Sequence, residues 1–447
     1  MADLQAEYAD HAAAMQHRFE RALAANGWDS ALVYSGSLQP IFRDDQTQPF
    51  RAHAWFKAWA PLTAVPECLI QVRPGEKPLL LFHQPADFWH EPAPLPTGDW
   101  TRHFQLRAVP DLATARAALP HSLARTAFIG ELPQAASRWG LGAINPEQLL
   151  LSLDFSRAVK TPYELSMLRA ASHSAALGHR AAAAAFEAGA TEYEIHSAFL
   201  KACGLREQEL PYNAIVALNE AGAVLHYQNL RRERPTSHHS LLIDAGTEFN
   251  GYASDVTRTW SFQDPDFRAL VEAVDDAQQR LCGQVRAGVD WRDIHLASHQ
   301  AIAGVLRDAN LIHCDPEQAV GSGVSSVFLP HGIGHLLGLQ VHDVAGLQQG
   351  PTGGTIPRPP GHPYLRLTRV LEPGFVVTME PGLYFIEPLL AAARADATQA
   401  TLINWSRVEA LRKFGGIRIE DNLAVTATGC ENLTRDAFAA VAASVSS

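Results

Sequence analysis

The chain has 447 residues, of which 47% are apolar and 19% charged, so a disordered or collagen-like chain is excluded. Its formal net charge is −11 and it has no long basic run, which makes nucleic acid and anionic membranes poor partners. The first thirty residues carry acids and lack an apolar core, and no uncharged apolar run is long enough to span a membrane. Five scattered cysteines without a CxxC pair indicate reduced, buried thiols. Together these features predict a soluble, cytoplasmic globular protein.

The N-terminal third alternates helical and strand-like patterns, which predicts an α/β domain. A helix is expected over residues 8–26, and short apolar runs bounded by turn residues predict strands at 31–34, 68–72, 78–82 and 126–129. Thr161-Pro162-Tyr163-Glu164 then has the residue types of a capping box with proline at the first helical position, which predicts the start of a long helix. We therefore expect two domains, 1–157 and 158–447.

The second domain contains a weak internal repeat. Residues 188–196 align with residues 287–295 at an offset of 99, and each copy ends one helix at a glycine and caps the next. The repeat predicts two similar halves around a pseudo-two-fold axis, with a site between them.

A segment rich in glycine and proline lies later in this domain. Ten of the eighteen residues from 346 to 363 are Gly or Pro, which predicts a long loop without regular structure. Such a loop is either a disordered surface segment or a wall over the active site.

A hairpin supplies the first candidate site residues. Strand-like runs at 241–249 and 252–260 flank Asn250-Gly251, a strong signal for a two-residue hairpin turn. Pairing across this turn places Asp244 opposite Thr257, so Asp244 and Asp255 become diagonal neighbours, about 7–8 Å apart at the backbone. Two carboxylates directed at one point repel each other unless a cation lies between them. A solvated hairpin face carrying two unrelated acids is the alternative interpretation.

Histidines and further acids add to this pair. Three histidines among glycines and apolar residues predict an imidazole site, and the glycines argue against the helical HExxH zinc pattern. These histidines are His331, His335 and His342. Glu380 ends an apolar strand-like run, and Glu420 alternates with Arg418 in another. Each acid alone is more readily an ordinary charge at a strand end.

Taken together, four carboxylates and one imidazole can hold two divalent ions, with shared carboxylates bridging them. These residues are Asp244, Asp255, His335, Glu380 and Glu420. An oxygen-rich set with one histidine favours Mn²⁺, although Co²⁺, Zn²⁺ or Fe²⁺ could substitute. The sequence has no GxSxG elbow, phosphate-binding GxxxxGK[ST] loop or CxxC pair that would indicate a competing chemistry.

These motifs resemble the pita-bread metallopeptidases, which include methionine aminopeptidase, aminopeptidase P and prolidase. The resemblance rests on the Asp244–Asp255 hairpin, the histidine segment 331–342, Met379-Glu380-Pro381-Gly382 and residues 417–422. Shorter segments narrow it to the bacterial Xaa-Pro dipeptidases (prolidases) and the related organophosphorus acid anhydrolases. They are Phe42-Arg43-Asp44-Asp45, Asp87-Phe88-Trp89-His90, Pro211-Tyr212-Asn213, Val224-Leu225-His226-Tyr227 and Pro363-Tyr364-Leu365-Arg366. The implied fold is α+β, with an N-terminal creatinase-like α/β domain and a C-terminal pita-bread domain with pseudo-two-fold symmetry.

The resemblance also implies residue roles. Asp244, Asp255, His335, Glu380 and Glu420 are the implied metal ligands, with Asp255 and Glu420 bridging and Glu380 handling the proton of the bridging water. The other catalytic roles fall to His226 and His342 at the substrate, and to His331 and Arg418 in support. Arg366 is implied to bind the carboxylate of a dipeptide, and Tyr212 to contact the substrate. Asp45 and Trp89 are implied to reach the substrate amine from the N-terminal domain of a second subunit.

The implied activity is hydrolysis of Xaa-Pro dipeptides by a metal-bridging hydroxide, in a homodimer. Hydrolysis of organophosphate triesters is a possible side activity of the same site. One alternative is cleavage of longer Xaa-Pro peptides, as by aminopeptidase P, which needs an open pocket instead of a carboxylate clamp. A metal-free binding module of the same fold is the non-enzymatic alternative.

Overall fold

The computed structural model describes residues 2–445 and divides the chain into two compact units. The N-terminal unit comprises the chain up to Met167 together with Asn250–Tyr252 and Gln349–Gly354, and the C-terminal unit comprises the rest. Across the described residues, no helix combines the length and the apolar character that crossing a membrane requires. All five cysteines are free; three are buried as expected, whereas Cys203 and Cys430 are only partly buried.

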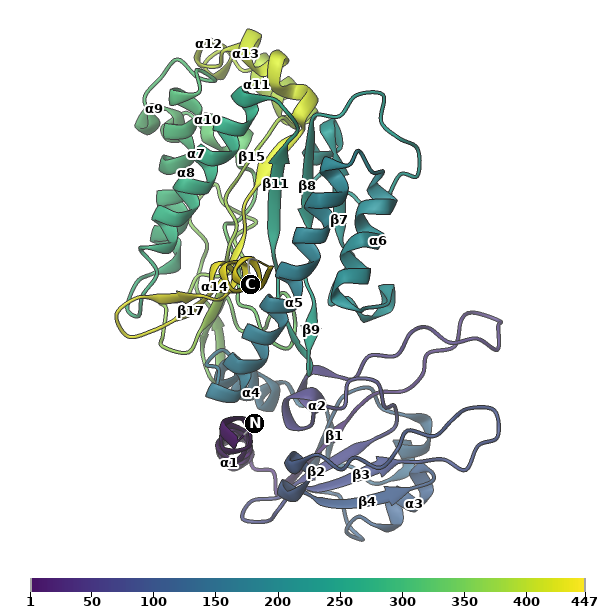
Figure 1. The fold of residues 1–447 in the computed structure, drawn as a ribbon. Coiled ribbons are helices and arrows are strands. Elements are labelled where there is room, and N and C mark those ends of the chain that lie inside the picture. Colours follow the sequence, from purple (N-terminus) through teal and green to yellow (C-terminus); the bar gives the residue numbers. More distant parts are fainter. Residues whose placement is uncertain (1, 446–447) are drawn as a thin grey trace. The chain divides into compact units, whose positions relative to one another are not determined.

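A mixed six-stranded sheet forms the centre of the N-terminal unit, in the order β4-β3-β2-β1-β5-β6 (Figure 1). Its strands are β1 (Ser30–Tyr34), β2 (Leu69–Val72), β3 (Leu79–His83), β4 (Gln105–Val109), β5 (Thr126–Ile129) and β6 (Ala143–Ile144). The helices of this unit are α1 (Ala2–Asn26), α2 (Ala54–Trp59), η1 (Asp99–His103), α3 (Leu112–Ala117), η2 (Gln134–Arg138) and α4 (Glu147–Arg157). The four predicted strands are confirmed to within one residue at each end, whereas the first helix begins at Ala2 instead of residue 8.

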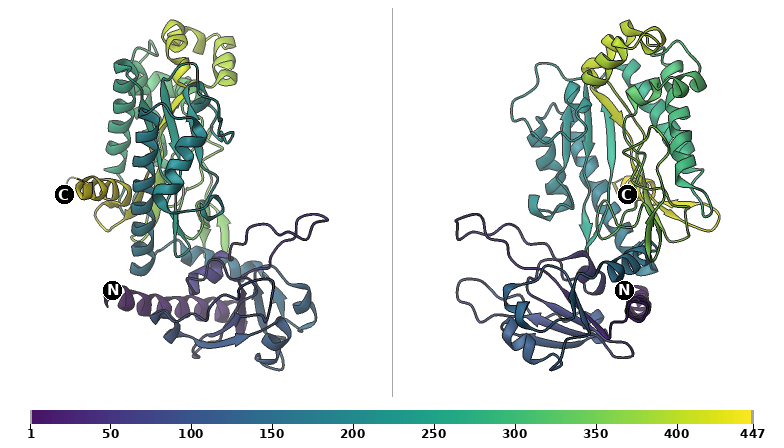
Figure 2. Two further views of the ribbon diagram at one scale, coloured as in Figure 1. Left: turned by 45° about the vertical axis from the view of Figure 1, so that its right-hand side comes forward. Right: turned by 180° about the vertical axis from the view of Figure 1, so that it is seen from behind.

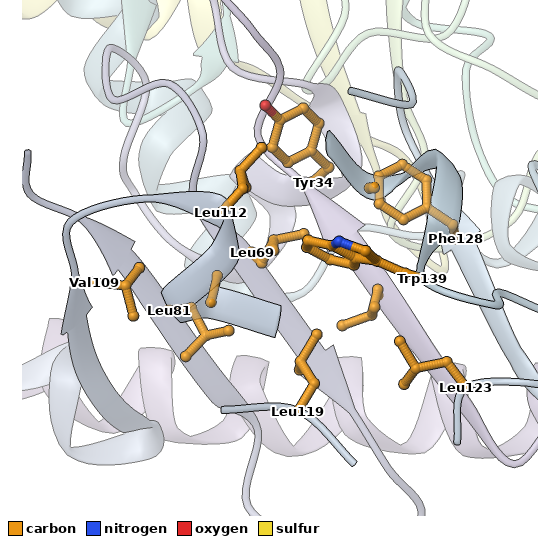
Figure 3. Close-up of a cluster of buried hydrophobic side chains, with 12 residues drawn as sticks. Tyr34, Leu69, Leu81, Val109, Leu112, Leu119, Leu123, Phe128 and Trp139 are labelled. Carbon is orange, nitrogen blue, oxygen red and sulfur yellow. The ribbon is translucent and has the colours of Figure 1, made fainter. Parts of the chain in front are cut away.

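Apolar side chains cover this sheet on both faces. Strand β1 is buried along its whole length, as expected for a run of apolar residues in a strand with both faces packed. One core cluster joins side chains of β1, β2, β3 and β5 to α3 and to Trp139 (Figure 3). A second aromatic group packs Phe19 of α1 edge-on against Trp55 and Trp59 of α2.

Within residues 2–445, ten α-helices and twelve strands lie in or extend into the C-terminal unit. The longer helices are α5 (Pro162–Glu187), which begins in the N-terminal unit, α6 (Glu192–Cys203), α7 (Pro265–Cys282), α8 (Trp291–Asp308) and α14 (Leu433–Val445). The shorter helices are α9 (Pro316–Gly321), α10 (Val324–Phe328), α11 (Glu387–Ala395), α12 (Gln399–Leu402) and α13 (Trp405–Leu411), with 3₁₀ turns η3 (Glu207–Glu209), η4 (Asn219–Ala223) and η5 (Arg412–Phe414). The first strands are β7 (Ile215–Leu218), β8 (Ser240–Asp244), β9 (Glu248–Phe249), β10 (Tyr252–Ala253), β11 (Thr257–Ser261), β12 (Gln348–Gly350) and β13 (Gly353–Thr355). The remaining strands are β14 (Val376–Met379), β15 (Gly382–Tyr384), β16 (Gly416–Arg418), β17 (Asp421–Val425) and β18 (Cys430–Asn432).

Two pairs of long helices flank sheets of this unit. Helices α5 and α6 flank the sheet β11-β8-β7, and helices α7 and α8 flank the half that contains β14-β17-β18 (Figures 1 and 2). The predicted capping box at the start of α5 is present: the Thr161 amide donates to Glu164 Oε2 (2.8 Å) and the Glu164 amide to Thr161 Oγ1 (3.3 Å).

The internal repeat folds alike in the two halves. Thr191 caps α6 and Asp290 caps α8, at equivalent positions of the repeat. Gly189 (φ +77°) and Gly288 (φ +83°) share the left-handed conformation that favours glycine. The capped helix start and the glycine conformation are therefore alike in residues 188–196 and 287–295. The expectation that each glycine ends a helix holds only for α5, because α7 ends at Cys282, six residues before Gly288.

The predicted hairpin register is confirmed. Asp244 of β8 pairs with Thr257 of β11, and Asn250 (φ +49°) and Gly251 (φ +94°) form the turn, both with the positive φ that a type I′ turn requires. Neither arm of the hairpin is a continuous strand, however. The first arm is interrupted between β8 and β9, and the second between β10 and β11.

Gly246 explains this interruption. The two arms of the hairpin cross so closely at Gly246 that a Cβ added there would lie 1.9 Å from the Ser254 carbonyl oxygen. Hydrogen bonds keep the register across the crossing, from the Ala245 amide to the Val256 carbonyl (3.0 Å) and from the Ser254 amide to the Thr247 carbonyl (2.8 Å).

The prediction that residues 346–363 lack regular structure is wrong in part. Strands β12 and β13 form a two-stranded ladder joined by a turn at Pro351-Thr352, and β13 begins at Gly353 (φ +99°). Glycine and proline content predicts where a chain turns, but it does not show which of the intervening residues pair. Residues 361–365 line a cavity that His331 also borders, which supports the interpretation of this segment as a wall near the site.

We expect Gly246→Ala to lower the free energy of unfolding by at least about 1–3 kcal/mol, the range for overpacking, because the new methyl group collides with a backbone carbonyl. Gly304→Ala is the matched control, since Gly304 lies inside α8 with no atom within 4 Å of the added Cβ. Alanine there should stabilise the protein by roughly 0.5–1 kcal/mol. Urea unfolding measures both variants, and equal stability of the two would contradict this account of the crossing.

Candidate metal centre

Four carboxylates and one imidazole converge in the C-terminal unit. They come from five segments: Asp244 ends β8, Asp255 precedes β11, His335 follows α10, Glu380 follows β14, and Glu420 lies between β16 and β17. His335 Nε2 lies 3.4 Å from Asp255 Oδ2 and 3.6 Å from Glu380 Oε1. Ligand atoms of Asp255, His335 and Glu420 all lie within 4.8 Å of one another, a spacing that could hold a metal ion.

A backbone bridge between the two halves positions the carboxylates. The Glu420 amide donates to the Thr257 carbonyl (3.0 Å), so the start of β11 meets the break between β16 and β17. The Thr257 hydroxyl then donates to Glu420 Oε2 at 2.7 Å. Asn422 holds the other side of the pair, because its Oδ1 accepts from the Asp255 amide at 3.0 Å.

A second bridge positions the imidazole and Glu380. Leu336 pairs with Val377 of β14, which brings the histidine segment alongside this strand. Thr378 Oγ1 accepts from the His335 amide (3.1 Å) and donates to Glu380 Oε1 (3.4 Å). His335 Nδ1 donates to the Leu336 carbonyl at 3.0 Å, so its Nε2 is the nitrogen that faces the carboxylates, the arrangement typical of a histidine that binds a metal.

The buried guanidinium of Arg418 partly neutralises the carboxylates. It donates to Asp244 Oδ2 (2.7 Å), to Thr257 Oγ1 (3.2 Å) and to the Tyr384 hydroxyl (3.1 Å). His331 Nδ1 donates to the Gly332 carbonyl (2.8 Å), so Nε2 accepts from the Tyr384 hydroxyl (2.8 Å). Burial lowers the pKa of His331 to about 4, consistent with this neutral form. Tyr384 therefore links Arg418 to His331.

The cluster holds more negative charge than the protein neutralises. If all four carboxylates were ionised, they would outnumber the single guanidinium by three charges, and burying that excess without a counter-ion would be costly. Burial, reinforced by neighbouring acids, raises the pKa of Glu420 well above its usual range and that of Glu380 to about 7. The pKa of Asp244 is raised as well, mainly by burial, and its Oδ1 is buried without a hydrogen-bond partner.

His335 responds to the same excess of negative charge. Burial alone would lower its pKa, but the hydrogen bond to Asp255 and the charge of Glu380 outweigh burial and raise it. The same hydrogen bond outweighs burial at Asp255 and lowers its pKa. In the absence of a metal ion, a proton on His335 Nε2 therefore occupies the position between the imidazole and the carboxylates in which a cation would bind. Two divalent ions would bring four positive charges, so the donor set and its charge fit the metal pair that the resemblance implies.

Several predicted substrate residues lie near this cluster. The His342 ring lies 4.5 Å from the His335 ring between centroids, and burial lowers the pKa of His342 to about 4. His226 and Arg366 are exposed, and the charge of each contributes to lowering the pKa of His342. The Tyr212 hydroxyl is buried without a hydrogen-bond partner, and burial with the charges of the neighbouring aspartates raises its pKa.

Two arginines at the end of the glycine- and proline-rich segment differ in their environments. Arg369 is buried, donates to Glu372 Oε1 (2.7 Å) and stacks over the Phe375 ring. Arg366 is exposed, and none of the ion pairs among the described residues includes it. Arg366 is therefore the more available of the two for a carboxylate.

Asp45 and Trp89 lie outside the C-terminal unit. Both are on exposed segments of the N-terminal unit, where the Trp89 side chain is 77% exposed and packs at a tilt against the Phe88 ring, with centroids 4.6 Å apart. Their contribution to a site stays a prediction.

Three supporting residues were not predicted from the sequence. Thr257 could have been found from the sequence, because the predicted hairpin pairs it with Asp244 and so places both side chains on one face of the sheet. Thr378 had another, since it lies two residues before Glu380 in an extended stretch, where alternate side chains point to the same side. Tyr384 had none, because its role depends on how β15 and β16 pair.

Comparisons with known proteins cover almost the whole chain. Residues 6–155 match the family described as "Xaa-Pro dipeptidase, N-terminal domain", and residues 166–427 match "Metallopeptidase family M24". The chain is 49% identical over 442 residues to a Xaa-Pro dipeptidase of Stenotrophomonas maltophilia (strain K279a), covering 98% of both chains. It is 47% identical over 441 residues to a Xaa-Pro dipeptidase of Xanthomonas axonopodis pv. citri (strain 306), covering 98% of this chain and 99% of the relative.

Solved structures support the predicted fold. The Pseudomonas aeruginosa aminopeptidase PepP superposes with a TM-score of 0.71 at 23% identity, covering 99% of both chains. The zinc-substituted Escherichia coli aminopeptidase P in complex with product superposes with a TM-score of 0.69 at 22% identity, covering 96% of this chain and 98% of the other. With the two family matches, this confirms the predicted N-terminal α/β domain and C-terminal pita-bread domain.

We expect cation binding to release protons from the cluster. Near pH 6.5 the Glu380 carboxyl, with a pKa of about 7, is mostly protonated, so a bound cation must displace this proton. Affinity for Mn²⁺ should therefore fall as the pH is lowered from about 8 to about 6. Titration calorimetry in two buffers of different ionisation enthalpy counts the released protons, and Glu380→Gln should release fewer. Heats that do not depend on the buffer would contradict the prediction.

Proposed function

Because the chain belongs to metallopeptidase family M24, whose members use divalent metal ions, we propose that it hydrolyses Xaa-Pro dipeptides. The observation that carries this proposal is the convergence of five donor side chains, three of them buried and two half-buried, in which four carboxylates face a single guanidinium. The side chains of Asp244, Asp255, His335, Glu380 and Glu420 would hold the metal pair, and the family resemblance implies that Asp255 and Glu420 would serve both ions. The names of relatives at 47–49% identity support the dipeptide as substrate.

The donor set indicates which ions bind and what they contribute. Carboxylate oxygens outnumber the single imidazole, which favours Mn²⁺, although Co²⁺, Zn²⁺ or Fe²⁺ could substitute. Bound divalent ions would polarise the scissile carbonyl and activate the attacking water.

The residues around the metal pair move protons and orient the substrate. Glu380, which gives up its own proton when the ions bind, takes the proton of the attacking water on its carboxylate and passes it to the leaving proline nitrogen. His342 is neutral and donates a hydrogen bond to the carbonyl oxygen as negative charge develops there. His226 and the unpartnered hydroxyl of Tyr212 contact the substrate. Arg418 donates a hydrogen bond to the Tyr384 hydroxyl, which in turn donates to His331. These two bonds fix the position of the His331 ring beside the carboxylates.

Recognition of a dipeptide follows from the chemistry of its ends. The Xaa-Pro bond is a tertiary amide without an N–H, so a backbone-reading protease has little to grip. The proline carboxylate, in contrast, is a strong target for a free guanidinium, which can bind it with two hydrogen bonds. Arg366 supplies that group, because Arg369 is already bonded to Glu372.

The second candidate function is cleavage of longer Xaa-Pro peptides. The aminopeptidase P structures favour it only through their fold, since their identity to this chain is 21–24%. Phosphotriester hydrolysis is proposed as a side activity, because the tetrahedral phosphoryl group resembles the intermediate of amide hydrolysis. Both activities would use the same metal pair as dipeptide hydrolysis, but neither would depend on Arg366 to bind a dipeptide carboxylate.

We also propose that the protein is a homodimer in which a second copy supplies Asp45 and Trp89. Both side chains are exposed in the N-terminal unit, and Trp89 with its neighbour Phe88 (86% exposed) forms an apolar surface that a partner could cover. A cytoplasmic location stays a prediction from composition.

We expect Asp255→Asn and Glu420→Gln each to abolish peptidase activity and to lower the bound metal below two ions per chain, because each carboxylate serves both ions. Glu317→Gln, an exposed acid at the start of α9, is the matched control and should leave both unchanged. Elemental analysis and a Gly-Pro hydrolysis assay give the two readouts. Full activity with two ions bound in either ligand variant would refute the assignment.

Arg366→Ala should weaken kcat/KM for Leu-Pro by about 2–5 kcal/mol, or roughly 30-fold to several thousand-fold, because the dipeptide carboxylate loses its partner. Hydrolysis of a neutral phosphotriester and the metal content should change little, since neither involves that carboxylate. Arg369→Ala is the comparison, and it should mainly lower thermal stability because Arg369 is buried. Equal losses on both substrates for Arg366→Ala would mean that Arg366 supports the fold or the metals.

Trp89→Ala should reduce dipeptide turnover without loss of metal, because the ligands lie in the other unit. Ile144→Ala, another exposed apolar residue of the N-terminal unit (47% exposed), should have no effect. Analytical ultracentrifugation of the unmodified protein at assay concentration should show a dimer. A fully active monomer would contradict the proposal.

A further inference from the structure

Three histidines form a second cluster, separate from the carboxylates. His295 and His299 lie on α8, and His362 lies in the irregular segment after β13. The ring centroids are 5.0 Å apart for His295 and His299, and His362 lies 4.6 Å from each. One nitrogen of each ring lies within 4.8 Å of the other two, a spacing that could hold a metal ion.

The two helical histidines are buried with unused hydrogen-bonding atoms. Each is only 1% exposed. Both ring nitrogens of His295 and Nε2 of His299 are buried without a hydrogen-bond partner, whereas His299 Nδ1 contacts Ser325 Oγ at 3.1 Å. Buried polar atoms are nearly always paired, and each unpaired one costs about 1–3 kcal/mol. Three such atoms in one place therefore point to a missing ligand.

The imidazoles are neutral and can each offer a lone pair. Burial, with a smaller contribution from the neighbouring histidines, lowers the pKa of His295 to about 3 and that of His299 to about 4. Burial lowers the pKa of His362 as well. At neutral pH no proton competes for the nitrogens, and neutral imidazole is the form that binds a metal.

The spacing and surroundings fit a zinc-type site. His295 and His299 are four residues apart and share one face of α8, as pairs of metal-binding histidines on a helix do. Zn–N bonds of about 2.0–2.1 Å in a tetrahedron place the nitrogens ~3.4 Å apart, so small side-chain rotations close the set around an ion. A cavity of about 210 Å³, bordered also by His331, Tyr364 and Leu365, leaves room for a water or another ligand at a fourth position.

We propose that His295, His299 and His362 bind one divalent transition-metal ion of the zinc type, distinct from the metal pair at the carboxylates. The two sites differ in donor chemistry, since three nitrogens suit Zn²⁺ whereas the oxygen-rich cluster suits Mn²⁺. The ion fastens the segment around His362 to α8. Because this segment continues into Leu365 and Arg366, the ion fixes the wall that leads to the proposed carboxylate-binding arginine.

The test uses the full-length protein with the double substitution Asp255→Asn and Glu420→Gln as background, so that the carboxylate cluster does not mask zinc binding. Competition with a chromophoric chelator measures the affinity for Zn²⁺, and elemental analysis measures the stoichiometry. We expect this background to bind one Zn²⁺ per chain. Adding His362→Asn should weaken binding at least tenfold, whereas adding His313→Asn, an exposed histidine of the same unit, should not.

A second measurement identifies the ligands independently of affinity. Co²⁺ in place of Zn²⁺ should give visible absorption bands that disappear with His362→Asn and remain with His313→Asn. His362 is only partly buried, and thermal unfolding of the zinc-free His362→Asn variant should match its parent. Absence of zinc binding in the background, or equal zinc affinity with and without His362→Asn, would overturn the proposal. Either result leaves the peptidase assignment untouched, because that assignment depends on other residues.

Discussion

Repulsion among four carboxylates, two of them buried and two half-buried, is the constraint on which the rest of the structure depends. Asp244, Asp255, Glu380 and Glu420 lie together in the C-terminal unit, and Arg418 contributes one positive charge. The pKa values of Glu420, Glu380 and Asp244 are raised, which shows that ionising these carboxyls is costly. Burial is the main cause of the increase, and repulsion from the neighbouring carboxylates adds to it. Divalent cations would neutralise the carboxylates and remove that cost, so binding of the metal pair should also stabilise this part of the fold.

The surrounding framework resists this repulsion with buried hydrogen bonds. The Thr257–Glu420 bridge is reinforced by Arg258, whose guanidinium donates to the Glu420 carbonyl (2.8 Å) and to Asp421 Oδ1 (2.6 Å). Asp421 in turn accepts from Arg435 (2.8 Å), and these two arginines hold its pKa at about 2 although the carboxyl is buried. The ligands therefore stand on a rigid base, while the substrate side, with His226 and Arg366, is exposed. This division suits a site that must hold ions firmly and exchange dipeptides.

The sequence predicted those features that depend on local pairing rules. Residue spacing alone placed Asp244 opposite Thr257, because a two-residue turn determines the register of both strands. The crossing at Gly246, the ladder of β12 and β13, and the role of Tyr384 were missed, since each depends on contacts between segments far apart in sequence. The three-histidine cluster was missed for the same reason: His295 was visible only as part of the repeat, and the helix and loop meet only in three dimensions.

Anomalous X-ray diffraction from crystals loaded with Mn²⁺ tests the central claim most directly. The account predicts two manganese peaks about 3.5–4 Å apart, both within bonding distance of Asp255 and Glu420. The Arg418 guanidinium should remain on Asp244 Oδ2, because the other carboxylate oxygen of Asp244, Oδ1, has no hydrogen-bond partner and can bind an ion. A single ion, or two ions bound away from Asp255 and Glu420, would contradict the account.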